Sequence, residues 1–254
     1  VPRPGPGRRI GVFSVAANKQ VSFSQGNLQY LKINDKWQFA ENQWDYIGED
    51  NIKDGQLANR IDLFGWSANN TTAPFGISTS INDADYKGAF VDWGINIIQS
   101  DASGTWRTLS SEEWEYLRNG RLNAQQLLGI ACVNGINGLI LLPDNCVLPD
   151  DFHFKCGTHT LYGEEYFKEV NDYTLDEWLV LQQLEAVFLP ASGTCIGVSY
   201  QNSRIGGSYY SSSPSSEYYA CIFNLRSNIT RTMSGQSRHI ARSVRLVHDT
   251  IVPK

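Results

Sequence analysis

Alternating apolar and polar positions predict short strands at the start of the chain. Gly11–Ser14, Gln20–Phe23 and Leu28–Leu31 each alternate with a period of two, which is typical of strands with one buried face. Asn18 and Gly26 separate these segments, and both residue types favour turns. The pattern therefore predicts a meander of antiparallel strands.

From Asp45 to Gly94 the alternation weakens into segments rich in Asn, Asp and Gly. Aromatic residues recur through this region, and large aromatic side chains favour burial. We expect these residues to hold long, ordered loops against the core: Trp44, Phe64, Trp66, Phe75 and Trp93.

Two capping boxes predict two helices. Ser110 to Glu113 and Thr174 to Glu177 both have the S/T-x-x-E pattern, in which side chain and backbone cap each other at a helix start. Trp114 and Trp178 follow directly, so each helix is expected to bury an indole. Between the helices, the turn pair Asn134-Gly135 separates Ile130–Val133 from Leu139–Leu142 and predicts a β-hairpin.

The composition changes after Gly193. Ser, Tyr, Asn, Gly and Arg dominate, Glu217 is the only acidic residue up to Val247, and lysine is absent. Within this region Cys221–Arg226 alternates like a strand, which predicts Phe223 and Leu225 on the core face. Ile222, Asn224 and Arg226 are then expected on the outer face. Ser243–Val247 alternates as well, so a sheet should anchor the region at both ends.

The bulk properties limit the classes of partner. A chain of 254 residues with 41% hydrophobic content can build a substantial core. Its net charge of -5 argues against nucleic acid or an anionic membrane surface as the main partner. No apolar run approaches the roughly 20 residues that span a bilayer, so no direct membrane insertion is expected.

Motifs for catalysis or metal binding are missing from the sequence. The four histidines lack metal-ligand spacing, and no GxSxG, P-loop or GxGxxG occurs. In Asp50–Gly55, which weakly resembles a calcium loop, Ile52 stands where an oxygen ligand is needed. The five cysteines form no CxxC, and their odd number leaves at least one unpaired. We expect no catalytic residues, no metal and no cofactor.

The composition after Gly193 has a rationale in recognition chemistry. Tyrosine gives a large, stiff contact, serine and glycine adapt to a partner, and arginine supplies forked hydrogen-bond donors, a set that antibody paratopes favour. Ser208–Tyr219 fits this chemistry. By composition alone, a structural loop rich in Ser and Tyr that covers the core fits equally well.

Several segments carry a family resemblance. Trp106–Tyr116, with the sequence WRTLSSEEWEY, resembles the W-R-L-P-T-E-x-E-W-E-Y segment of the formylglycine-generating-enzyme branch of the C-type lectin fold. Gly138–Asp144, Ala186–Gly193, Tyr209–Pro214 and Ser243–Val247 are similar to segments of the variable proteins of diversity-generating retroelements. These include phage tropism determinants and surface proteins of gut bacteria.

The resemblance implies a single α+β domain of the C-type lectin fold, with short antiparallel strands, two helices and long ordered loops. It covers about residues 9–249. Residues 1–8 are expected to be a flexible tail that stems from processing or from expression, and residues 250–254 a C-terminal tail. Catalytic members of the branch need a cysteine pair near the C-terminal end, and iron-dependent members need a three-histidine motif. Both are missing here, so the resemblance implies a binding protein.

In the retroelement family, mutagenesis at adenines diversifies exposed ligand-facing positions near the 3′ end of the gene. Substituted AAC codons cannot give Lys or Glu, which suits the composition of residues 194–242. Tyr210, where relatives carry Trp, and Ala241, where Gly is usual, depart from the family pattern. Carried over to this chain, the ligand-binding positions are Thr194, Ile196, Val198, Ser208, Ser215, Ser216, Tyr218, Tyr219, Cys221, Ile222, Asn224, Arg226, Asn228, His239, Ile240 and Arg242.

The resemblance further implies a receptor-recognition role outside the cell, on a bacterial surface or a phage virion, with a cell-surface protein or glycan as the ligand. The main alternative is a structural or adhesive tip subunit that packs the same face against a neighbouring subunit. An enzyme with an unusual site is a more distant alternative. The sequence leaves the oligomeric state open.

Overall fold

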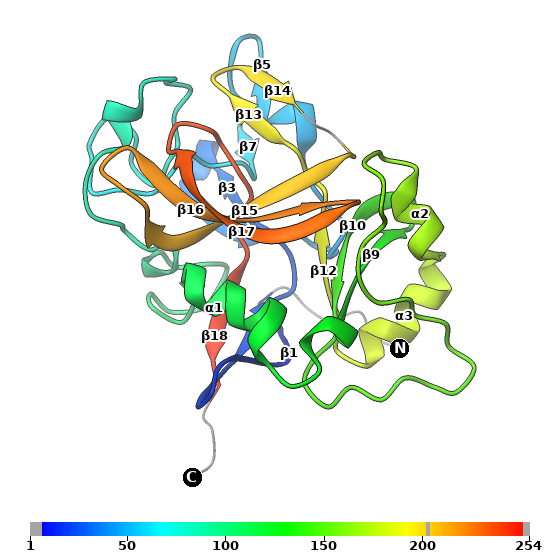
Figure 1. The fold of residues 1–254 in the computed structure, drawn as a ribbon. Coiled ribbons are helices and arrows are strands. Elements are labelled where there is room, and N and C mark those ends of the chain that lie inside the picture. Colours follow the sequence, from blue (N-terminus) through cyan, green and yellow to red (C-terminus); the bar gives the residue numbers. More distant parts are fainter. Residues whose placement is uncertain (1–6, 202–203, 251–254) are drawn as a thin grey trace.

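The computed structural model describes residues 7–201 and 204–250. Small, mostly antiparallel sheets and a few short helices form a mixed α+β fold (Figure 1). Of the tails expected at residues 1–8 and 250–254, positions 1–6 and 251–254 lie outside the described residues.

The first sheet joins both ends of the described chain. β1 (Arg9–Ala16) pairs with β2 (Lys19–Ser24), β18 (Leu246–Asp249) pairs with β2, and β8 (Arg107–Thr108) pairs with β18, all antiparallel. The two strands predicted here are confirmed. The predicted meander is wrong, because β18, and not the third predicted strand, pairs with the free edge of β2.

The third predicted strand is confirmed but belongs to another sheet. β3 (Leu28–Leu31) lies between β4 (Lys36–Phe39) and β7 (Arg60–Ile61). A separate short hairpin follows β4, in which β5 (Ile52–Lys53) and β6 (Gln56–Leu57) are strands of two residues each. The loops around these strands are held down as predicted.

A cluster of buried aromatic rings holds these loops. Phe64, Trp66 and Trp93 are fully buried, and Phe75 packs against the same cluster. The Trp93 Nε1 donates to the Phe75 carbonyl oxygen at 2.9 Å. The prediction that aromatic residues fix this region is therefore confirmed.

The predicted hairpin is also confirmed. β9 (Leu128–Val133) and β10 (Ile136–Leu141) are antiparallel, and β10 also pairs with β12 (Val187–Pro190), while β11 (Asp172–Tyr173) adds to β9 in parallel. Asn134 and Gly135 have φ values of 50° and 81°, the left-handed conformation that a type I′ turn requires at both central positions.

Both predicted helices begin at their capping boxes. α1 (Ser111–Glu115) continues into one π-helical turn (Tyr116–Gly120), and α3 (Leu175–Gln183) runs for nine residues. Trp114 and Trp178 are fully buried, as predicted. The expectation of only two helices is wrong, since a short α2 (Tyr166–Val170) forms as well. Short 3-10 turns lie at Lys32–Asn34, Gly48–Asn51, Asp83–Tyr86, Trp93–Ile95 and Ala124–Gln126.

The C-terminal region forms two sheets of its own. β15 (Gly206–Pro214), β16 (Tyr219–Arg226) and β17 (Ile229–Ser237) make a three-stranded sheet, with α1 on one side of it and the hairpin of β13 (Thr194–Ile196) and β14 (Ser199–Gln201) on the other (Figure 1).

Strand β16 is anchored to the core through one face. The Phe223 ring stacks on the Trp114 indole, with ring centroids 4.7 Å apart and 9° between the planes. Leu225 is fully buried in the same core cluster. The prediction that these residues face the core is confirmed, and these contacts hold the sheet against α1 and the core.

The predicted strand Ser243–Val247 is only partly correct. β18 begins at Leu246, and Ser243, Val244 and Arg245 are fully buried, although alternation predicted an exposed face. Arg245 is accommodated by hydrogen bonds to the Asn27 Oδ1 at 3.2 Å, the Gln25 carbonyl oxygen at 3.1 Å and the Gln43 Oε1 at 2.9 Å. These acceptors offset the cost of burying a guanidinium.

Candidate functional site

A pocket opens between the three-stranded sheet and the β13–β14 hairpin. Its volume is about 200 Å³. We call it the C-terminal pocket, and it is lined by Tyr162, Gly193, Thr194, Ile196, Gln201, Gly206, Gly207, Ser208, Ile222, Asn224, Arg226, Met233, Gln236, Ile240 and Arg242.

Strand register explains why these side chains meet. In the β15–β16 pair, Ser208 lies opposite Asn224 and Gly206 lies opposite Arg226, so the Ser208, Asn224 and Arg226 side chains share one face of the sheet. Ile222 lies opposite Met233 in β17, which brings both to the same face. At Gly207, a Cβ atom would lie 2.9 Å from the Pro190 carbonyl oxygen, so glycine permits the close approach of the neighbouring segment.

Half of the sixteen positions expected to bind ligand line this pocket, although they come from four separate segments of the chain. These eight are Thr194, Ile196, Ser208, Ile222, Asn224, Arg226, Ile240 and Arg242. The other eight lie elsewhere: Val198, Ser215, Ser216, Tyr218, Tyr219, Cys221, Asn228 and His239.

The expectation of a simply exposed outer face on β16 needs correction. Ile222 is 3% exposed and Asn224 9%, whereas only Arg226 is open to solvent. Ile222 belongs to a core cluster that also contains Tyr210, and Met233 packs against that cluster. Two further predicted positions, Ser208 and Arg242, are buried as well. The pocket floor is therefore partly core, because neighbouring segments cover it.

The predicted positions outside the pocket occupy three kinds of environment. Ser215, Ser216, Tyr218 and Tyr219 are exposed at the β15–β16 turn, and Val198 and Asn228 are exposed at the two other hairpin turns. At the first turn, the Lys87 ammonium lies 4.3 Å from the Tyr218 ring centroid and 3.1 Å from a Glu217 carboxylate oxygen.

Cys221 and His239 are directed away from the pocket. Cys221 shares the core-facing side of β16 with Phe223 and is half-buried next to Ser111. The His239 Nδ1 lies 2.9 Å from an Asp83 carboxylate oxygen, which also accepts a hydrogen bond from the His239 backbone N–H. This pair fixes the chain between β17 and β18.

The C-terminal pocket carries positive charge. Arg226 and Arg242 line it, and no acidic side chain does so among the described residues. The Arg226 guanidinium lies 5.3 Å from the Tyr162 ring centroid at the pocket edge. The Arg242 Nη1 donates to the Tyr210 hydroxyl at 3.0 Å and to the Ile240 carbonyl oxygen at 2.9 Å, while its buried Nε has no partner.

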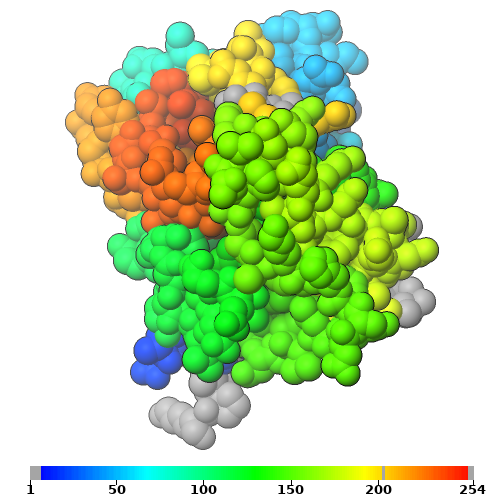
Figure 2. Space-filling view, turned by 45° about the vertical axis from the view of Figure 1, so that its right-hand side comes forward, coloured from blue at the N-terminus to red at the C-terminus, as the bar shows by residue number. Residues whose placement is uncertain are grey.

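Seven lining residues were not predicted from the sequence. Met233 could have been found from its place in the strand opposite Ile222 once that pairing was known. Tyr162 had no local signal, because it comes from the loop between β10 and α2. That loop lies beside the C-terminal sheet (Figure 2), and its Gly163 N–H donates to the Ser227 Oγ at 3.0 Å.

The described residues contain no group of three or more His, Cys, Asp or Glu side chains placed to hold a metal. In the segment that weakly resembles a calcium loop, the Asn51 Oδ1 accepts hydrogen bonds from the backbone N–H groups of Asp62 and Leu63. Its side chain is thus committed to the fold. Burial raises the pKa of the Cys195 and Cys221 thiols, so both stay protonated at neutral pH.

Comparison with known proteins identifies no relative. No family model, no curated protein and no solved structure matches this chain. Within residues 7–201 and 204–250, no helix is both long and apolar enough to cross a membrane.

Proposed function

We propose that this chain is a non-catalytic ligand-binding protein of the C-type lectin fold, in its formylglycine-generating-enzyme-like subclass. It is a variable protein of a diversity-generating retroelement, displayed on a bacterial surface or a phage virion. Its C-terminal region recognises a protein or glycan on another cell. Small antiparallel sheets with few helices and long ordered loops fit this fold.

One observation carries the proposal. Eight positions that the family resemblance implies for ligand contact converge on a single pocket, although four segments supply them. Below the pocket, Phe223 stacks on Trp114 and holds the sheet against α1. Adaptable residues on a rigid sheet are the arrangement that recognition surfaces use.

The chemistry of the pocket favours a ligand with an anionic group. Arg226 is exposed at the pocket edge, and Asn224, two residues earlier on the same face of β16, lies deeper in the pocket. A carboxylate or sulfate can therefore accept hydrogen bonds from the Arg226 guanidinium and the Asn224 amide together. Ile222, Ile196 and Met233 provide an apolar floor for the rest of the ligand. A few polar groups above an apolar floor are typical of ligand pockets.

Binding to an array of carboxylated and sulfated oligosaccharides and acidic peptides tests the proposal. We expect the wild type to bind members of this array, and Arg226→Ala and Asn224→Ala each to weaken binding about five-fold or more, as for an anchoring contact. Arg9→Ala is the matched control, since Arg9 is an exposed arginine in another sheet.

Unchanged binding in both pocket variants would refute the assignment of this surface. Loss of self-association in the same variants, measured by sedimentation, would instead favour a subunit-packing role for this face. The nucleotide sequence tests the family independently, because the proposal requires a near-copy of the 3′ end of the gene close to a reverse transcriptase gene.

A further inference from the structure

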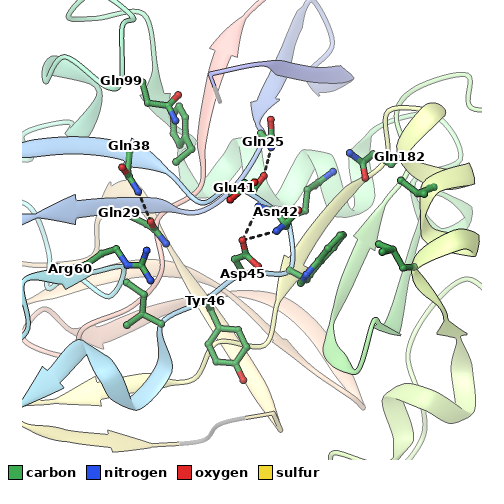
Figure 3. A pocket seen from close by; sticks show the side chains of 16 residues that line it. Gln25, Gln29, Gln38, Glu41, Asn42, Asp45, Tyr46, Arg60, Gln99 and Gln182 are labelled. Atoms are coloured by element: carbon green, nitrogen blue, oxygen red, sulfur yellow. Dashed lines mark hydrogen bonds between the residues drawn. The ribbon is translucent and has the colours of Figure 1, made fainter. Parts of the chain in front are cut away.

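A second and larger cleft lies outside the C-terminal region. It has a volume of about 840 Å³ and shares no lining residue with the C-terminal pocket. It is bounded by β3, β4, the segment of residues 41–47 and α3. Figure 3 shows amide side chains around this space, so we call it the glutamine cleft: Gln25, Gln29, Gln38, Asn42, Gln99 and Gln182.

The wall formed by residues 41–47 is fixed in place. The Gln43 Nε2 donates to the Ala186 carbonyl oxygen at 3.0 Å, and its Oε1 accepts from the Phe188 N–H at 2.8 Å. In the same segment, an Asp45 carboxylate oxygen accepts hydrogen bonds from the Asn42 backbone N–H at 2.8 Å and from the Asn42 Nδ2 at 3.0 Å. The cleft is therefore formed before any ligand arrives, which lowers the entropic cost of binding.

Several amide groups in the cleft have unused hydrogen-bonding capacity. Gln25 is 3% exposed and its Nε2 donates to the Glu41 carbonyl oxygen, yet its Oε1 is buried with no partner. The Gln99 Oε1 is buried and unpartnered as well. Buried polar atoms without partners are rare and costly in native proteins. Both atoms are enclosed by the protein, so the hydrogen bonds to a ligand come from the amide groups that are open to the cleft.

A cross-strand pair adds a donor and an acceptor. The Gln38 Nε2 donates to the Gln29 Oε1 at 3.0 Å (Figure 3), which leaves the Gln29 Nε2 and the Gln38 Oε1 available to a ligand. The two side chains lie opposite each other on β3 and β4. A ligand that both donates and accepts matches this arrangement.

The opposite wall is largely apolar. Trp44 lines the cleft with Leu175 and Leu179 of α3, and Leu179 is 37% exposed. The charged lining residues Glu41, Asp45 and Arg60 give the cleft a net formal charge of only -1. A strongly charged ligand would meet little electrostatic attraction here.

We propose that the glutamine cleft binds a neutral saccharide. Each sugar hydroxyl donates and accepts, as the free amide groups do, and the C–H faces of a sugar ring suit the indole and leucine wall. The volume lies within the range of small-ligand pockets. This site is independent of the C-terminal pocket, where Arg226 and Arg242 favour an anionic group.

A microarray of neutral oligosaccharides, followed by titration calorimetry of the best binder, tests the proposal. We expect binding by the wild type and a loss of about five-fold in affinity for Gln38→Ala and for Gln182→Ala, which each remove one amide partner. Gln183→Ala is the matched control, because Gln183 is the adjacent, exposed glutamine of α3 outside the cleft. Melting temperatures of all variants verify that each one is folded.

Fluorescence gives a second readout. Trp44 is the only tryptophan among the lining residues, so Trp44→Phe should remove a saccharide-induced change in emission. Retained affinity in Arg226→Ala would separate this site from the C-terminal pocket. The proposal is overturned if no neutral oligosaccharide binds, or if both cleft variants keep wild-type affinity.

Discussion

Replacement of Trp114 tests how the C-terminal sheet is held to the core. The indole is fully buried, stacks on Phe223 at 4.7 Å, and lies 6.0 Å from Phe23 and 6.4 Å from Tyr209 between ring centroids. Trp114→Ala removes all three contacts and leaves a cavity, so we expect the free energy of unfolding to fall by about 3–5 kcal/mol. For a chain of this size the melting temperature should fall by about 6–20 °C.

Trp114→Phe is the matched control. The phenyl ring of this variant can keep the stack on Phe223. The Trp114 Nε1 is buried without a hydrogen-bond partner, so the substitution also removes an unsatisfied donor. An unsatisfied buried donor costs about 1–3 kcal/mol, which should offset most of the lost volume. Urea unfolding followed by circular dichroism measures both variants. The reasoning fails if Trp114→Ala costs under about 1 kcal/mol or if Trp114→Phe costs as much as Trp114→Ala.

Three further changes probe other parts of the fold. Ile222→Ala should lower the free energy of unfolding by about 2–4 kcal/mol, because Ile222 is only 3% exposed; an unchanged urea midpoint would contradict its place in the core. Burial raises the pKa of Asp62 to about 6, above its ordinary value near 4, so the stability it contributes is complete below about pH 4 and is lost as the pH rises through 6. Urea unfolding between pH 4 and 7 should show this decline in the wild type and a smaller one in Asp62→Asn; equal slopes would refute it. Thr174→Ala should cost about 1 kcal/mol by breaking the capping box of α3, and a melting temperature equal to that of the wild type would exclude this role.

Local signals in the sequence located much of the fold. The capping boxes at Ser110 and Thr174 each depend on residues within one helical turn, and the Asn134-Gly135 turn depends on two adjacent residues. Physical preferences of this kind act over a few residues, so the sequence displays them directly. The core-facing side of β16 was predictable for the same reason, because alternation along one strand is local.

Long-range packing could not be predicted in this way. Alternation placed Ile222 on the outer face of β16, but in the fold it pairs with Met233 and is buried in the aromatic cluster that contains Tyr210. Alternation predicted an exposed Arg245, but its side chain is buried and donates hydrogen bonds to acceptors more than 200 positions away in the sequence. The same limit hid Tyr162 in the C-terminal pocket and left the glutamine cleft without any sequence signal, since its amides come from four distant segments.

The buried Arg245 has a consequence for how the chain reaches its native state. Its acceptors on Gln25, Asn27 and Gln43 lie 220, 218 and 202 positions earlier in the sequence, so these contacts form only after the more than 200 residues between the partners have been synthesised. Contacts at such separations require loop closure before they stabilise anything, and they are typical of slow-folding topologies. A chain that ends before Ser243 would leave these acceptors, and the β2 edge that β18 covers, open to water and to other chains.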